Sequence, residues 1–123
     1  MEGRALVVDD DPEVLAALAQ LLQDWGLSVM AARDGAAALR LVAIHGHPDA
    51  VVTDFRLPEG ESGLDVLRRL RAVAPAFRGV VLSGDIGPDE ALEVQRSGYA
   101  LLLKPVSAAR LRSTVGELLD SGG

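Results

Sequence analysis

Two patterns of apolar residues alternate along this chain. Short apolar runs, rich in valine and leucine, each stop at a polar or charged residue, which is typical of strands in the middle of a parallel sheet. Between these runs, apolar residues recur every three or four positions, as they do on the buried face of a helix. The strands are expected at residues 5–8, 28–32, 50–53, 79–82 and 99–103.

The expected helices are marked by residues that start and stop them. Asp11, Asp34 and Ser107 precede helical patterns, and their side chains can accept hydrogen bonds from the first free N–H groups. Ser62 followed by Asp65 forms a capping-box pattern. The five helices are expected between Asp11 and Gly26, Asp34 and His45, Ser62 and Pro75, Pro88 and Gly98, and Ser107 and Leu119.

Strands and helices that alternate in this way predict an α/β fold with a parallel sheet and right-handed crossovers. The chain has 123 residues, which favours one domain, with residues 4–120 as its core and residues 121–123 as a flexible tail. The fourth helix has the smallest apolar face, made only by Ala91, Leu92 and Val94.

Composition narrows the class of protein. With 49% hydrophobic and 24% charged residues, a compact soluble domain is expected. The absence of cysteine excludes disulfides and thiolate metal sites and favours a cytoplasmic setting. A formal charge of −6 argues against direct contact with nucleic acid. No apolar run is long enough to cross a membrane.

Polar side chains follow four of the predicted strands. Asp9 and Asp10 follow the first, Asp54 the third, Ser83 the fourth and Lys104 the fifth. Because the carboxyl ends of parallel strands share one edge of a sheet, these groups should converge there. Crowded carboxylates disfavour one another's ionised forms, and a hard cation that prefers oxygen ligands, such as Mg²⁺, relieves that conflict.

These groups suit phosphoryl transfer to a carboxylate. Asp54 would be the nucleophile, Mg²⁺ would neutralise charge, and Ser83 and Lys104 would hold the phosphoryl oxygens. Each residue also has an ordinary interpretation when taken alone: a solvated acidic turn for Asp9 and Asp10, a turn hydroxyl for Ser83 and a surface lysine for Lys104.

The sequence resembles the receiver domain of two-component response regulators over residues 4–120. The resemblance rests on four motifs in this order and spacing: Val7-Val8-Asp9-Asp10-Asp11-Pro12, Val52-Thr53-Asp54 with Leu57-Pro58, Leu82-Ser83-Gly84, and Leu103-Lys104-Pro105. It implies a flavodoxin-like, doubly wound sheet of strand order 2-1-3-4-5, flanked by five helices.

The resemblance also implies a set of roles. Asp54 would accept a phosphoryl group from the phosphohistidine of a histidine kinase or a phosphotransfer domain, and the domain would catalyse this transfer and its own dephosphorylation. Mg²⁺ would be bound by Asp54, directly by Asp10, through water by Asp9, and by the backbone carbonyl of Arg56.

Two further residues acquire roles from the same resemblance. Ser83 takes the place of the hydroxyl residue that moves toward the phosphoryl group. Lys104 matches the family's invariant lysine, and its bond to Pro105 is usually cis in the family.

Two features depart from the common family pattern. The switch position on the last strand is usually aromatic, whereas here it is Leu101, and Tyr99 should point to the same sheet face by the period-two rule. The loop at residues 58–63 is one residue longer than usual, which is similar to receivers at the C-terminus of hybrid sensor histidine kinases. We therefore expect a receiver related to a hybrid kinase, in a parent chain that could be membrane-attached.

The expected output is a conformational switch read by a partner, or by a second copy, on the face made by the fourth helix, fifth strand and fifth helix. Arg96, Arg110 and Arg112 are candidate contacts there. One alternative is a receiver-like interaction module that works without phosphorylation, for which Leu101 leaves room. The other is a haloacid-type phosphatase, which would need a second acid where Arg56 stands.

Overall fold

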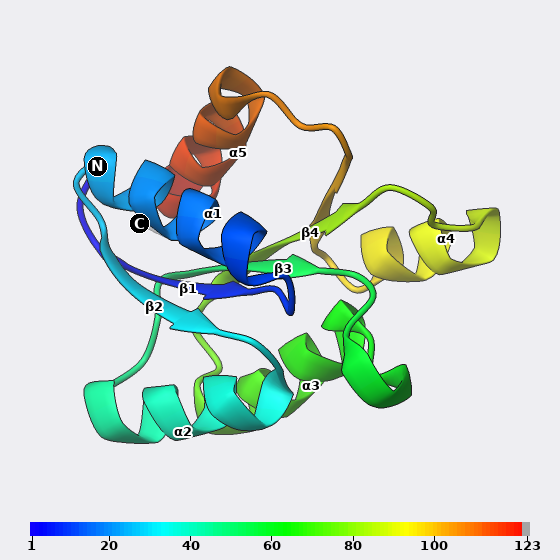
Figure 1. Ribbon diagram of the computed structural model, residues 1–123, viewed down its shortest axis with the longest axis horizontal. Coiled ribbons are helices and arrows are strands. Elements are labelled where there is room, and N and C mark those ends of the chain that lie inside the picture. The colour runs from blue at the N-terminus through cyan, green and yellow to red at the C-terminus, as the bar shows by residue number, and fades with distance from the viewer. Residues whose placement is uncertain (122–123) are drawn as a thin grey trace.

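The computed structural model describes residues 1–121, and they form a three-layered α/β domain (Figure 1). The five strands are all parallel and lie in the order β2-β1-β3-β4-β5. They are β1 (Arg4–Val8), β2 (Ser28–Ala32), β3 (Ala50–Asp54), β4 (Arg78–Ser83) and β5 (Ala100–Leu103). The predicted fold and strand order are therefore confirmed.

Helices cover both faces of the sheet (Figure 1). One face carries α1 and α5, the other carries α2 and α3, and α4 contacts the edge strand β5 and packs its Val94 into the cluster on this second face. The helices are α1 (Pro12–Asp24), α2 (Gly35–His45), α3 (Gly63–Val73), α4 (Pro88–Arg96) and α5 (Ala108–Ser121), with a short 3₁₀ turn η1 (Pro58–Gly60) before α3. Of the expected tail, Ser121 still belongs to α5, and residues 122 and 123 lie outside the described residues.

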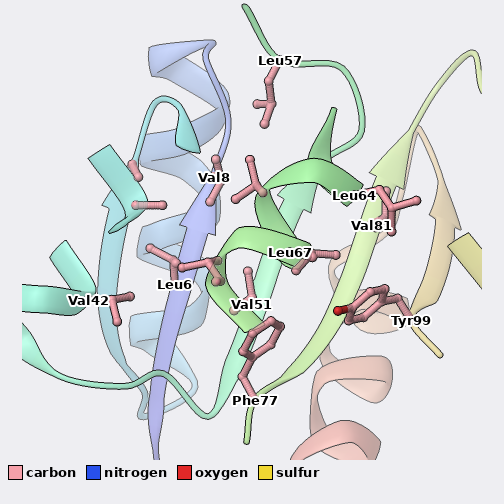
Figure 2. Close-up of a cluster of buried hydrophobic side chains, with 14 of the residues drawn as sticks. Leu6, Val8, Val42, Val51, Leu57, Leu64, Leu67, Phe77, Val81 and Tyr99 are labelled. Carbon is pink, nitrogen blue, oxygen red and sulfur yellow. The ribbon is translucent and has the colours of Figure 1, made fainter. Parts of the chain in front are cut away.

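Alternation along the strands divides the core in two. In β1, Leu6 and Val8 pack toward α2 and α3, while Ala5 and Val7 pack toward α1 and α5. Figure 2 shows the first of these clusters. This division follows from the two-residue period of a strand, which sends neighbouring side chains to opposite faces.

The predicted helix caps are confirmed. The Asp11 side chain accepts from the Glu13 N–H at 3.0 Å, and that of Asp34 accepts from Ala37 at 2.8 Å. Ser107 accepts from the Arg110 N–H at 3.1 Å. The Ser62 side chain accepts from the Asp65 N–H at 3.1 Å, and the Asp65 side chain accepts from the Ser62 N–H at 3.0 Å.

Two expectations about the β5 side of the molecule were wrong. Leu92 is 43% exposed and does not share the buried face of α4 with Val94. Residues two positions apart in a helix point in directions about 200° apart around its axis. Leu103 is 64% exposed, although its strand was expected to be buried on both faces. The reason is that β5 is an edge strand.

Candidate phosphoacceptor site

Strand register brings the predicted site residues to one edge of the sheet. Val8 pairs with Thr53, so Asp9 and Asp54 follow at the same level on neighbouring strands. On the other side, Asp54 pairs with Leu82, directly before Ser83. The Lys104 N–H then donates to the Ser83 carbonyl at 2.8 Å. The expected convergence is therefore present in the structure.

Three carboxylates form the centre of this edge. Asp9, Asp10 and Asp54 each offer an oxygen within 4.8 Å of the others. Asp9 is only 2% exposed, Asp54 is partly buried and Asp10 faces solvent. The cluster therefore has a closed inner end and an open outer end.

The buried end of the cluster has a carboxylate oxygen that no hydrogen-bond donor of the described chain reaches. Asp9 Oδ1 accepts from the Asp11 N–H at 2.9 Å, but among the described residues Asp9 Oδ2 has no hydrogen-bond partner. Burial raises the pKa of Asp9, because its charged form is poorly solvated there. A buried oxygen without a donor, beside two more carboxylates, fits a divalent cation with oxygen ligands.

Lys104 supplies the positive charge of the site. Its Nζ lies 3.2 Å from Asp54 Oδ1 and 3.8 Å from Asp9 Oδ2. The Lys104–Pro105 bond is cis, as the family resemblance implied. The lysine therefore stands beside the carboxylate that would carry the phosphoryl group.

Ser83 is buried at the end of β4, with 1% exposure. Its hydroxyl accepts from the Asp85 N–H at 3.4 Å and donates to Asp85 Oδ1 at 3.5 Å. Both contacts are long, so little holds the hydroxyl in this orientation.

Gly63 has a role that sequence reasoning missed. Its N–H donates to the Phe55 carbonyl at 2.6 Å. A Cβ at Gly63 would collide with the Asp54 carbonyl oxygen and press on the Thr53 side chain. The first residue of α3 is thus a glycine because the helix begins against the backbone of β3 at Asp54.

Arg56 has partners that the sequence did not reveal. Its Nε lies 3.1 Å from both carboxylate oxygens of Asp85, and its Nη2 donates to Glu90 Oε1 at 3.0 Å. The hydrogen bond with Glu90 and then those with Asp85 raise the pKa of Arg56. The pKa of Glu90 is lowered by its hydrogen bond from Arg56 and, second, by that from the Gly87 N–H. The guanidinium also lies 5.2 Å from the centre of the Phe55 ring.

The switch position lacks an aromatic substitute. Leu101 is half-buried and packs on the same face as Tyr99, as the period-two rule predicted. The Tyr99 hydroxyl, however, accepts from Arg71 at 3.2 Å, and its ring lies parallel to Phe77 with centres 6.4 Å apart. Figure 2 shows Phe77 and Tyr99 at the end of the cluster opposite Leu57, so Tyr99 does not replace a ring at the site.

The lengthened loop after Asp54 is tied to the neighbouring helices. Glu59 adopts a left-handed conformation, with φ 61°. Glu61 Oε1 accepts the N–H of Gly35, the first residue of α2, at 2.9 Å, and Oε2 lies 2.6 Å from Arg69 of α3. The loop therefore joins α2 and α3 through one carboxylate.

Two other groups lie away from the site. His45 and His47 both face solvent. Arg112, one of the candidate partner contacts, lies 6.0 Å from the Trp25 ring centre and thus faces α1.

Within residues 1–121, no helix has the length and apolar character needed to span a membrane.

The family model described as "Response regulator receiver domain" matches residues 5–116. The chain is 40% identical over 123 residues to the transcriptional regulatory protein PrrA of Mycobacterium tuberculosis, covering 98% of this chain and 51% of PrrA. It is 36% identical over 123 residues to the sensory/regulatory protein RpfC of Xanthomonas campestris pv. campestris, covering 96% of this chain and 17% of RpfC. The chain thus spans about half or less of these curated relatives.

Solved structures agree with this match. A response regulator receiver domain protein from Clostridium thermocellum superposes with a TM-score of 0.85 at 27% identity. The superposition covers 96% of this chain and 94% of that one.

Proposed function

This chain belongs to the response regulator receiver domain family, and on that premise we propose that it accepts a phosphoryl group on Asp54. The donor is the phosphohistidine of a histidine kinase or of a phosphotransfer domain. The observation that carries the proposal is the placement of the Asp54 carboxylate, 3.2 Å from Lys104 Nζ and next to the carboxylates of Asp9 and Asp10.

The proposed step is a displacement at phosphorus. An Asp54 oxygen forms a bond to phosphorus as the nitrogen–phosphorus bond of the donor breaks, and the imidazole nitrogen keeps the electron pair. Lys104 holds one phosphoryl oxygen, and the Ser83 hydroxyl turns from Asp85 to donate to another. Hydrolysis of the acyl phosphate returns Asp54 and releases inorganic phosphate.

Mg²⁺ is the proposed cofactor. Asp9, Asp10, Asp54 and the backbone carbonyl of Arg56 would hold it, and it would neutralise the charge that gathers on the phosphoryl oxygens. Asp9 Oδ2 supports this assignment because no donor in the described chain gives it a hydrogen bond. A buried carboxylate oxygen without such a bond lowers the stability of the fold.

An apolar hollow beside the site supports docking of a helical phosphodonor. Its volume is about 540 Å³, and Lys104 is among its lining residues. The remaining lining residues belong to α1, to the end of β4 and to the segment after Lys104: Val14, Ala17, Leu18, Leu21, Leu82, Pro105 and Val106. A helix packed there would place a histidine at the edge that holds Asp54.

Finer proposals concern the parent protein. The long loop after Asp54 supports a hybrid sensor histidine kinase as the parent protein, and relatives of similar identity include both PrrA and RpfC. The proposed location of the domain is the cytoplasm. The exposed side chains of Leu92 and Leu103 support a pairing surface on the α4–β5–α5 face for a partner or a second copy. Sedimentation velocity with and without beryllofluoride tests the second copy, and an unchanged monomer would refute it.

Intact-mass spectrometry after incubation with acetyl phosphate tests the proposed function. One added phosphoryl group is expected, and it should require both Mg²⁺ and Asp54. The variants are Asp54→Asn, which should take none, and the control Asp120→Asn, whose exposed carboxylate lies outside the site. No adduct from acetyl phosphate, phosphoramidate or beryllofluoride would favour the phosphorylation-independent module, and continuous hydrolysis of p-nitrophenyl phosphate would favour a phosphatase.

A further inference from the structure

One apolar residue, Val94, anchors α4 in the core, and charged contacts link its other turns to the rest of the domain. In the described chain, Val94 is the one fully buried residue of α4, and the residue before the helix is Gly87, which has no side chain to cap it. Three carboxylates of α4 and the loop before it instead meet two arginines of the β3–α3 segment. Arg56 pairs with Asp85 and Glu90, and Arg68 pairs with Glu93 at 2.6 Å.

Arg56 holds the amino-terminal end of α4. The Glu90 oxygen that it contacts also accepts the Gly87 N–H at 3.2 Å, so one carboxylate both caps the helix and receives the arginine. Arg56 Nη2 also lies 3.4 Å from the Asp85 carbonyl oxygen. The arginine thus fastens both the β4–α4 loop and the first turn of α4.

Asp85 has two side-chain partners, and a phosphoryl group on Asp54 would attract both. These partners are the Arg56 guanidinium and the Ser83 hydroxyl. Arg56 lies two residues after Asp54, about 7 Å along an extended chain, which is within the reach of an arginine side chain. A phosphoryl group carries close to two negative charges and presents the oxygen geometry that a guanidinium binds with two hydrogen bonds.

The competing contacts are exposed. The Arg56 side chain is 50% exposed, and those of Asp85 and Glu90 are 69% and 40% exposed. Ion pairs of this kind are weak, because water and salt screen them. A doubly charged group beside Arg56 can therefore displace them.

We propose that Arg56 is a phosphorylation-sensitive latch on α4, an inference that rests on the proposed phosphorylation of Asp54. In the resting chain, Arg56 holds the amino-terminal end of α4 through Asp85 and Glu90. When Asp54 is phosphorylated, the guanidinium exchanges these carboxylates for phosphoryl oxygens, and the first turn of α4 is released. Arg68 and Glu93 still hold the other half of the helix, so α4 pivots on that pair.

This route needs no aromatic switch residue. Leu101 has no hydrogen-bonding side chain, and Tyr99 is bound to Arg71 away from the site. Arg56 connects the phosphoacceptor loop to α4 directly, through charge alone. Arg56 is accordingly a positioning residue for α4.

Amide hydrogen exchange of residues 86–92, measured by NMR with and without Mg²⁺ and beryllofluoride, tests the latch. In the unmodified chain, beryllofluoride should speed exchange in this segment. Arg56→Ala should already exchange about threefold to tenfold faster, as expected from losing one or two exposed ion pairs, and should respond little further. Arg68→Ala, which removes the other arginine bridge to α4, should keep the response of residues 86–92.

A second variant separates the latch from a general loss of charge. Asp85→Asn combined with Glu90→Gln leaves Arg56 in place but removes its resting partners, so it should match Arg56→Ala in the resting state. Equal exchange in Arg56→Ala and the unmodified chain at rest, or a full beryllofluoride response in Arg56→Ala, would overturn the latch.

Mass spectrometry on the same samples separates this failure from failure of the proposed function. Arg68→Ala should take one phosphoryl group from acetyl phosphate, because the Arg68 side chain pairs with Asp65 and Glu93 outside the site, and the mass of Arg56→Ala shows whether that variant was modified in the exchange samples. If the unmodified chain takes none, the proposed function fails and the latch loses its trigger. If it is modified and α4 does not respond, the latch alone fails.

Discussion

The helices α3 and α4 follow the loops at the ends of β3 and β4, beside Asp54, yet they are attached to the domain in different ways. α3 buries five residues: Gly63, Leu64, Val66, Leu67 and Leu70. It also begins with a reciprocal capping box between Ser62 and Asp65. α4 buries only Val94 among its described residues and is preceded by a glycine, and its other links to the domain are exposed arginine bridges.

This difference sets what each helix can do. Moving α3 away from the core would expose its buried apolar side chains and cost free energy. The helix therefore holds the loop after Asp54 in a constant position. Ion pairs at the surface are weak and depend on nearby charge. If Asp54 is phosphorylated as proposed, the added charge would change the attachment of α4 and leave α3 where it is.

The largest expected effect comes from cutting the apolar anchor of α3. Leu67→Ala removes a side chain with 0% exposure and should lower the free energy of unfolding by about 2–5 kcal/mol. Leu92→Ala in α4, with 43% exposure, should change it by no more than about 0.5 kcal/mol. Urea unfolding followed by circular dichroism measures both, and similar losses would mean that α4 is anchored as firmly as α3.

The cap of α3 should matter less than its core contacts. Ser62→Ala removes the acceptor of the Asp65 N–H and should cost about 1 kcal/mol. The matched change in α4 is Asp89→Asn, an exposed first-turn acid, which should cost about 0.3–1 kcal/mol through the helix dipole alone. The same unfolding measurement compares them, and a larger loss in Asp89→Asn would reverse the comparison.

The site between the two helices should show its own pH dependence. Burial raises the pKa of Asp9 above the ordinary value of 3.8, so the folded, metal-free chain keeps a proton that the unfolded chain releases. Asp9 therefore favours folding at low pH, and this contribution is lost as the pH rises from 3.8 through the raised value.

Asp9→Asn should remove this fall in folding stability with rising pH, and Asp120→Asn should retain it. Unfolding midpoints in the presence of a chelator, measured across the acid range, test this. An identical pH profile in Asp9→Asn and the unmodified chain would show that the buried carboxylate is not the cause. Mg²⁺ should raise the midpoint of the unmodified chain at neutral pH and have less effect on Asp9→Asn.

The smallest expected change would make α4 resemble α3. Gly87→Ser would place a hydroxyl three residues before Glu90, which already accepts the Gly87 N–H, and would complete a capping box. The added Cβ would lie 3.5 Å from Glu90 Oε1, an ordinary contact. Stability should rise by a few tenths of a kcal/mol, and the beryllofluoride response of α4 should weaken. An unchanged response would mean that the first turn does not take part in the switch.

Local signals in the sequence were sufficient for much of this molecule. The period of the apolar residues identified five strands and five helices, and Asp11, Asp34, Ser62 and Ser107 marked helix starts that the structure confirms. Strand ends predicted the meeting of Asp9, Asp54 and Lys104, because parallel strands must end on one edge. These features depend on neighbours along the chain or on a topology that the alternation itself implies.

Other features required the folded chain. Whether Leu92 or Val94 faces inward depends on how α4 is rotated against the edge strand β5. The need for glycine at position 63 arises only because α3 begins against the Asp54 carbonyl.

The sequence by itself therefore determined the order of elements, the helix caps and the set of groups at the sheet edge that holds Asp54. Only the tertiary structure decided that Arg56 holds Asp85 and Glu90, that Glu61 holds the start of α2, and that Tyr99 is bound to Arg71. The physical reason is that a long polar side chain can reach several groups. The folded positions of segments far apart in the chain determine which of these groups it contacts.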